Sequence, residues 1–186
     1  MKRIVPMIVL VAAVAVIACS SRSFENSLTT ETQMAPDVTF AAYHTWKFAR
    51  EDEYPATGIA ALDDPAFREN VGRHMVTEMQ NLGYSKVDAD PDFVLMIHFI
   101  SENKFDEQKM NDIYQGYDMA WAQMSDEDYW KEGTLMLFAM DAKTGKQVWR
   151  GVARAHLEEA STMDTKKTRF KKVLTMMLED FPPAGK

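Results

Sequence analysis

The chain has 186 residues, about the size of one ordinary domain and enough to bury a substantial hydrophobic core. Its formal charge of −7 at pH 7 argues against nucleic acid as a general partner. Cys19 is the only cysteine, so the sequence excludes a disulfide within one chain and offers no second thiol for catalysis or metal binding.

Residues 1–18 have the layout of a secretory signal peptide. Lys2 and Arg3 precede an apolar stretch over residues 4–17, which is too short to span a bilayer comfortably. Ala18 supplies a small residue at the expected cleavage point. We therefore expect residues 1–18 to be removed, and the loss of Lys2 and Arg3 changes the formal charge from −7 to near −9.

A cysteine directly after Ala18 resembles the lipobox of bacterial lipoproteins. The resemblance implies cleavage before Cys19, attachment of a diacylglycerol to its thiol, and acylation of the new amino group. In the sorting rule of that class, aspartate after the lipidated cysteine retains the protein in the inner membrane. The residue here is Ser20, so the resemblance implies a lipid-anchored protein on the periplasmic face of the outer membrane.

Residues 19–37 are rich in Ser, Thr, Glu and Asn and lack a sustained period of 2 or 3.6 residues. This composition predicts a flexible tether, with a single folded domain over residues 38–183. Apolar and mainly polar residues alternate over residues 38–48, which predicts a strand with one buried face.

Two amphipathic helices are predicted. Asp64 is placed to cap the first helix, with Pro65 at its first position, and Gly83 ends it. Its apolar stripe recurs every three or four residues, at Phe67, Val71, Met75, Met79 and Leu82. The last helix carries a similar stripe at Phe170, Val173, Leu174, Met177 and Phe181.

Four further strands are expected after the first helix. Residues 84–87 predict a short strand and residues 93–100 a central strand that is apolar on both faces except at His98. Residues 133–141 and 146–157 form a predicted hairpin around Gly145, and Trp149 is expected to be buried beneath a helix.

These elements predict an α+β fold. We expect a two-layer sandwich with about five mainly antiparallel strands and two helices packed on one face of the sheet. The polar side of the strand at residues 38–48 predicts that the other face of the sheet is at least partly exposed to solvent.

Several short motifs occur in a fixed order along the predicted domain. They are Phe40-x-x-Tyr43-x-Thr45-Trp46, Leu82-Gly83-Tyr84, Asp90-Pro91-Asp92-Phe93, Gly133-Thr134-Leu135, Asp141 to Gly145, Val148-Trp149-Arg150-Gly151 and Phe181-Pro182-Pro183. This ordered set resembles domain-of-unknown-function family 4136, which contains bacterial lipoproteins of unassigned activity. The resemblance supports the predicted α+β fold and the predicted location in the outer membrane. It identifies no catalytic residues that could be carried over to this chain.

The sequence points to no metal site and no cofactor. Asp88, Asp90 and Asp92 have the spacing that opens a calcium loop, but the glycine and the bidentate glutamate that such a loop needs are replaced by Phe93 and Phe99. The four histidines show no ligand spacing. No nucleophile elbow or phosphate-binding glycine loop is present.

Residues 102–132 form a long excursion between two predicted strands. They carry nine acidic and three basic residues together with several aromatic side chains. One interpretation is a helical flap that packs on the sheet; the other is a binding element that contributes less to folding than to recognition. The candidate binding residues are Tyr114, Tyr117, Trp121, Tyr129 and Trp130.

Residues 166–172 contain five cations in an otherwise acidic chain. They form either a solvated helix face or a patch that faces anions, such as lipid headgroups or an acidic partner. The members of this basic patch are Lys166, Lys167, Arg169, Lys171 and Lys172.

These observations favour a periplasm-facing binding or accessory module of the cell envelope, whose partner is an envelope protein or a small ligand. Two other functions remain open at this point. One is a hydrolase that uses carboxylates beside residues 102–132, and the other is a carrier of a small apolar ligand.

Overall fold

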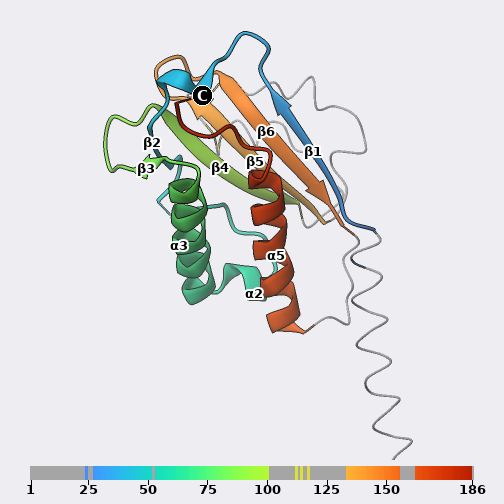
Figure 1. The fold of residues 1–186 in the computed structure, drawn as a ribbon. Coiled ribbons are helices and arrows are strands. Elements are labelled where there is room, and N and C mark those ends of the chain that lie inside the picture. Colours follow the sequence, from blue (N-terminus) through green and yellow to red (C-terminus); the bar gives the residue numbers. More distant parts are fainter. Residues whose placement is uncertain are drawn as a thin grey trace, which may run out of the picture.

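A computed structural model describes residue 24, residues 27–51 and 53–100, residues 112, 114 and 117, and residues 133–155 and 162–185. A twisted sheet forms one layer and helices form the other, as predicted for an α+β sandwich (Figure 1). The strands are β1 Thr29–Met34, β2 Thr45–Phe48, β3 Ser85–Lys86, β4 Phe93–Ile100, β5 Thr134–Asp141 and β6 Gln147–Arg154. The α-helices are α2 Ala60–Asp63, α3 Pro65–Asn81 and α5 Met163–Leu178.

The sheet has six strands in the order β1-β6-β5-β4-β2-β3, and it is mixed. The predicted sheet of about five mainly antiparallel strands is therefore wrong in detail. The pairs β1–β6, β6–β5 and β5–β4 are antiparallel, whereas β2 runs parallel to both β4 and β3. Helix α3 lies between β2 and β4 in the chain, and a helical crossover is the usual connection for a parallel pair.

The sixth strand, β1, lies inside the segment predicted to be a tether. Thr29 pairs with Arg154 and Met34 pairs with Trp149, so β1 forms the outer edge of the sheet beside β6. The tether prediction for residues 19–37 is thus wrong for residues 29–34. Most β1 side chains are exposed, which explains the missing apolar alternation: an edge strand needs backbone pairing more than a buried face.

The strand predicted over residues 38–48 is shorter than expected. Phe40–Ala42 form a 3₁₀ turn, and β2 begins only at Thr45. The Thr39 hydroxyl accepts a hydrogen bond from the Ala41 backbone N–H (3.3 Å), which favours the turn over an extended chain. Phe40 is nevertheless buried in the core, where its ring contacts those of Phe93 and Phe181.

Helix α3 follows its sequence signals closely. The Asp64 carboxylate accepts a hydrogen bond from the Phe67 backbone N–H (2.8 Å), and Pro65 occupies the first turn. Gly83 ends the helix with a φ of 91°, a conformation that glycine adopts without strain. Phe67, Val71, Met75 and Met79 are buried, as the stripe predicted.

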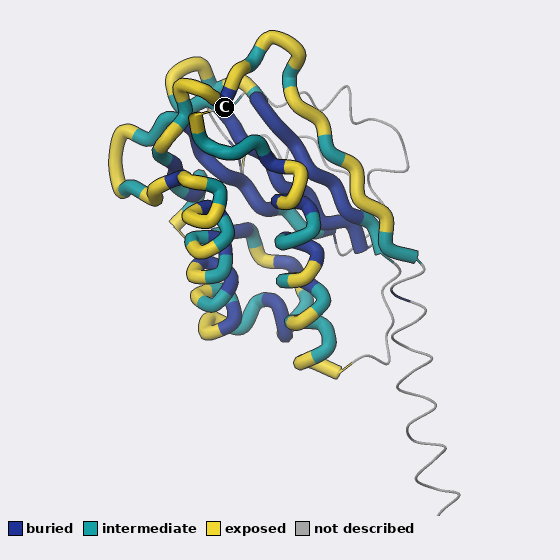
Figure 2. The backbone as a smooth tube through the Cα atoms, in the orientation of Figure 1, coloured by how far each residue is buried: buried dark blue, intermediate teal, exposed yellow. Residues whose placement is uncertain are grey.

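The main core lies between the sheet and helices α3 and α5, which cover one face side by side (Figures 1 and 2). Trp149 is buried there, as predicted, and its ring lies 4.8 Å from that of Phe181. Gly151 makes room for it: a Cβ at this position would lie 2.6 Å from Trp149 Cη2 and 3.3 Å from Met177.

The opposite face of the sheet carries a second buried cluster. Its side chains alternate with those of the main core along β4, β5 and β6, so both faces of these central strands are apolar. The prediction that the second face is partly exposed to solvent is wrong for this region. The cluster consists of Val94, Met96, Ile100, Tyr114, Met136, Phe138, Met140 and Val152.

Candidate functional site

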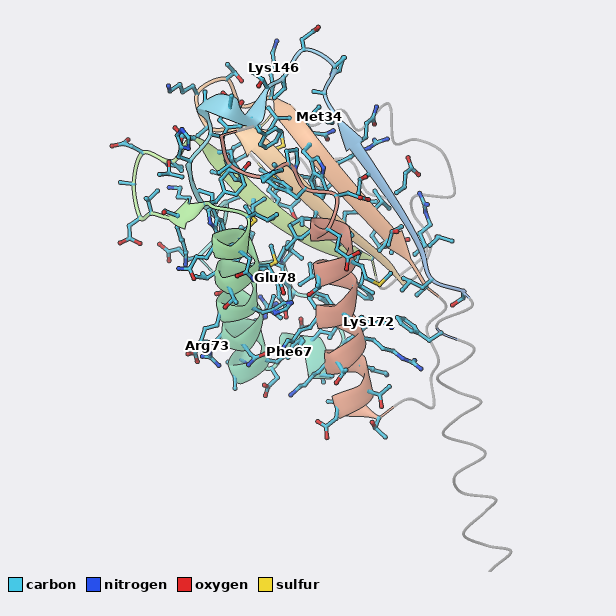
Figure 3. All side chains as sticks on the ribbon, viewed as in Figure 1. Met34, Phe67, Arg73, Glu78, Lys146 and Lys172 are labelled. Carbon is cyan, nitrogen blue, oxygen red and sulfur yellow. The ribbon has the colours of Figure 1, made fainter. Side chains whose placement is uncertain are left out.

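Helices α3 and α5 form the two sides of an open surface groove of about 700 Å³. Figure 3 labels Phe67 on α3 and Lys172 on α5, one on each side. The groove combines an aromatic ring with three lysines and two aspartates. Its lining residues are Asp64, Ala66, Phe67, Asn70, His74, Asp164, Lys167, Thr168, Lys171, Lys172 and Thr175.

The position of the cations follows from how α5 is built. The Thr162 hydroxyl caps the helix by accepting a hydrogen bond from the Thr165 backbone N–H (3.2 Å). The apolar stripe then fixes the face that packs on the sheet, with Phe170 and Leu174 buried. The cations occupy the remaining positions, so packing of the stripe turns them away from the sheet.

The structure brings part of the predicted basic patch together and separates the rest. Lys167 points toward α3: its Nζ lies 3.5 Å from an Asp64 oxygen and 5.5 Å from the centre of the Phe67 ring. Lys171 and Lys172 line the same groove. Arg169 lies over the Phe24 ring at 4.4 Å, outside the groove lining.

His74 lies in the groove wall beside the second half of α5. Its Nε2 is 2.9 Å from the Thr175 hydroxyl oxygen, which in turn donates a hydrogen bond to Glu78 (3.2 Å). Burial lowers the pKa of His74 and outweighs the opposing charge of Glu78. The charge of Lys171 lowers this pKa as well, whereas a hydrogen bond with the Lys171 backbone acts in the other direction. The ring is therefore mainly neutral at pH 7, and the lysines supply the positive charge of the groove.

The aromatic excursion contributes to the second face of the sheet. Tyr114 is buried, its hydroxyl lies 3.2 Å from His98 Nδ1, and it donates a hydrogen bond to the Ile97 carbonyl (3.3 Å). Tyr117 packs against the same cluster and is half-buried. The burial of Tyr114 agrees with the interpretation of a flap packed on the sheet, and at this position the excursion contributes to folding.

Four predicted site residues lie outside the described part of the chain. They are the lipidation residue Cys19 and three aromatic residues of the excursion, Trp121, Tyr129 and Trp130. Their predicted roles stay predictions.

Three aspartates that sequence counting could not distinguish hold loops in place. Asp92 accepts hydrogen bonds from the backbone N–H groups of His44 and Thr45 and from the Thr45 hydroxyl, each at 2.9 Å. Asp63 and Asp141 accept similar sets from neighbouring turns. Burial acts to raise the pKa of each carboxyl, but these hydrogen bonds outweigh it and hold each pKa below its ordinary value.

Among the described residues, no three or more His, Cys, Asp or Glu side chains gather closely enough to hold a metal ion. None of the helices formed by these residues has the length and apolar character needed to cross a bilayer.

Sequence reasoning missed two features of this site. The α3 side of the groove was not predicted, because helix spacing alone does not reveal which helices lie together. The contact between Phe24 and Arg169 was missed because Phe24 falls in a polar segment read as a tether.

Comparison with known proteins identifies the family. The family model of the domain of unknown function DUF4136 matches residues 30–183. The chain belongs to the DUF4136 family. Its matched region begins at β1, which agrees with a folded domain that starts before residue 38. No curated protein matches the chain.

Solved structures similar to this chain have low sequence identity, and one of them, with a TM-score of 0.53, shares the fold. A crystal structure of a DUF4136 family protein from Bacteroides thetaiotaomicron is 12% identical, with a TM-score of 0.53 over 86% of this chain and 99% of that chain. A PDZ domain protein from Parabacteroides distasonis gives 15% identity and a TM-score of 0.48, over 92% of this chain and 40% of that chain. A PelC dodecamer from Paraburkholderia phytofirmans gives 10% identity and a TM-score of 0.40, over 81% of this chain and 97% of that chain.

Proposed function

We propose that this protein is an outer-membrane lipoprotein that faces the periplasm and acts as a binding or accessory module. We further propose that its binding surface is the groove between α3 and α5 and that the ligand is anionic. The observation that carries the proposal is the gathering of Lys167, Lys171 and Lys172 around one open groove in an otherwise acidic chain. The sequence pattern around Cys19 supports the membrane location.

The chemistry of the groove suits an anion with an apolar part. Lysine ammonium groups bind phosphate or carboxylate as mobile point charges, and the Phe67 ring offers apolar contact beside them. Asp64 already lies 3.5 Å from Lys167, so an incoming anion competes with this carboxylate for that cation. Lys171 and Lys172 line the same groove about one turn further along α5, and they are the cations to test.

The alternative of a carboxylate hydrolase gains no support from the described carboxyl groups. A general acid in a hydrolase needs a pKa raised toward the working pH. Asp63, Asp92 and Asp141 have lowered pKa values and their oxygens are taken up by turn N–H groups. These three side chains stabilise loops, which favours the binding module over the enzyme.

The groove is tested by a matched pair of double variants. Lys171→Gln/Lys172→Gln removes two charges from the groove, and Lys143→Gln/Lys146→Gln removes two from the exposed turn between β5 and β6. Each protein is purified from detergent-solubilised envelopes, and the copurifying lipids and proteins are quantified by mass spectrometry. We expect the groove variant to lose an anionic species that the control retains. Equal recovery with both variants would remove the groove from the proposal.

The anchor is tested separately. Cys19→Ser should abolish incorporation of radioactive palmitate, because the thiol that receives the diacylglycerol is absent. Labelling that persists in this variant would contradict the lipobox interpretation without affecting the groove.

A further inference from the structure

Phe24 is the first residue that the structure describes, and it lies directly beside the basic helix α5. The Phe24 side chain is 6% exposed and belongs to the main core, and Arg169 lies over its ring at 4.4 Å. The Phe24 carbonyl accepts hydrogen bonds from the Leu28 backbone N–H and the Ser27 hydroxyl, both at 3.0 Å. These contacts fix the position of residue 24 on the domain.

From Phe24 the chain runs along α5 in the same direction as the helix. Phe24 contacts Arg169 in the first half of α5, and Thr32 of β1 donates a hydrogen bond to Asp180, just beyond its end (3.3 Å). The path back from Thr32 to Phe24 therefore leads toward the N-terminal half of α5. In Figure 1, β1 starts at the lower end of the sheet, and the first turns of α5 lie at the lower end of that helix.

Only five steps along the chain separate Phe24 from Cys19. A fully extended chain covers at most about 18 Å in five residues. If Cys19 carries lipid, as proposed above, Phe24 stays within this distance of the membrane interface. The part of α5 around Arg169 is then held near the headgroups.

Helix α5 as a whole is strongly basic. The helix carries five lysine or arginine residues and one acidic residue, Asp164. Lys166 and Lys167 lie in its first turns, where they oppose the helix dipole. Near an anionic bilayer each such cation gains about 1 kcal/mol, within a Debye length of about 8 Å at physiological ionic strength.

We propose that the basic patch of α5 rests on anionic phospholipid headgroups of the membrane in which Cys19 is anchored. A headgroup phosphate then occupies the groove between α3 and α5, with Lys171 and Lys172 as its cations. This inference rests on the proposed lipid anchor, and it names the anionic ligand of the proposed groove. It also sets the orientation of the domain, with the N-terminal ends of α3 and α5 toward the membrane.

The orientation can be measured with a single fluorescent label. Cys19 is the only native cysteine and is lipidated in the proposal, so one introduced cysteine is labelled alone. Thr168→Cys places the label at an exposed position within the basic patch. Gln80→Cys places it at an exposed position in the last turn of α3. Full-length lipidated protein is reconstituted in phosphatidylcholine vesicles with or without phosphatidylglycerol, and quenching by headgroup-attached nitroxide is recorded.

We expect the Thr168 label to be quenched strongly and the Gln80 label weakly when phosphatidylglycerol is present. Lys171→Gln/Lys172→Gln should lower the ratio of docked to undocked protein by about fivefold for each charge removed, whereas Lys143→Gln/Lys146→Gln should leave it unchanged. Lys172→Gln alone gives a milder variant should the double variant unfold. Moderate salt should reduce the quenching.

Flotation of the vesicles separates failure of the anchor from failure of the inference. If the protein floats with the vesicles but the two labels are quenched equally, or quenching ignores phosphatidylglycerol, the docked orientation is wrong and the anchor stands. If the protein does not float with either kind of vesicle, the lipid anchor fails and the orientation fails with it. If the Thr168 label stays unquenched while the groove variant loses an acidic protein in the copurification, the ligand is that protein and not lipid.

Discussion

The two faces of the sheet are closed in different ways. On one face, α3 and α5 cover buried strands (Figure 2). The core there is rich in aromatic side chains, and Phe40, Phe93, Phe181 and Trp149 meet largely edge to face. On the other face, the cluster is rich in methionine, and the described residues of the excursion that pack on it are Tyr114 and Tyr117.

This difference indicates which parts of the molecule tolerate change. Aromatic rings in edge contact have fixed geometry and resist substitution, whereas methionine side chains adapt to irregular neighbours. The helix-covered face should therefore carry most of the stability, and the second face should respond more gently to the loss of a side chain. The four predictions below test this contrast in order of expected effect.

The largest effect is expected for Trp149→Ala on the helix-covered face. The ring is 1% exposed and packs on Phe181, so its removal should cost about 3–5 kcal/mol in the free energy of unfolding. Urea unfolding followed by circular dichroism measures this loss. A cost below about 1 kcal/mol would show that the helix layer adjusts to the cavity and would remove the contrast between the faces.

The corresponding change on the second face is Tyr114→Ala. Tyr114 is 3% exposed, and we expect a smaller loss of roughly 2–4 kcal/mol because the methionines around it can partly fill the space. Tyr114→Phe keeps the ring and should cost only about 0.5–1.5 kcal/mol, the value of its hydrogen bond. If both variants match the wild-type protein in urea, Tyr114 is dispensable for folding and the recognition role of residues 102–132 regains support.

The sequence predicts the helix-covered face better than the second face, and the reason is physical. The start and end of helix α3 are marked in the sequence by Asp64, Pro65 and Gly83, and its apolar stripe predicts which side is buried. Strand β1 has no such signal, since an exposed edge strand is held by backbone pairing with β6 alone. Closure of the second face involves residues distant in sequence, such as Tyr114 and His98, whose proximity no local pattern encodes.

The candidate site shows the same division. The basic residues of α5 are visible as a run in the sequence, so the patch could be predicted. The groove needs α3 beside α5, and the route from Cys19 to the patch needs Phe24 packed under Arg169. Both depend on tertiary packing and became apparent only in the structure.

A third prediction tests how tightly the helix-covered face is packed. Gly151→Ala adds one methyl group that would lie 2.6 Å from Trp149 Cη2 and 3.3 Å from Met177. Such overpacking should cost about 1–3 kcal/mol. Combining it with Trp149→Ala should relieve the clash, so the double variant should be more stable than the sum of the two losses predicts. Simple additivity of the two losses in urea would show that Trp149 does not cause the strain.

The smallest effect is expected from His74, which links the helix layer to pH. Its folded-state pKa is lowered from the ordinary value of 6.5, chiefly by burial, so folding favours the neutral ring. This contribution to stability is complete above pH 6.5 and is lost progressively as the pH falls from 6.5 through the lowered pKa, because the unfolded chain then binds more protons. His74→Gln keeps a polar partner for Thr175 but cannot titrate, so its urea midpoint should fall less than that of the wild-type protein between pH 7.5 and pH 5, which is roughly the window of histidine titration. Identical pH profiles for the two proteins would show that protonation of His74 is not coupled to folding. In that case the acid sensitivity of the protein would come from carboxylates such as Asp92, whose lowered pKa places its effect nearer pH 4 and below.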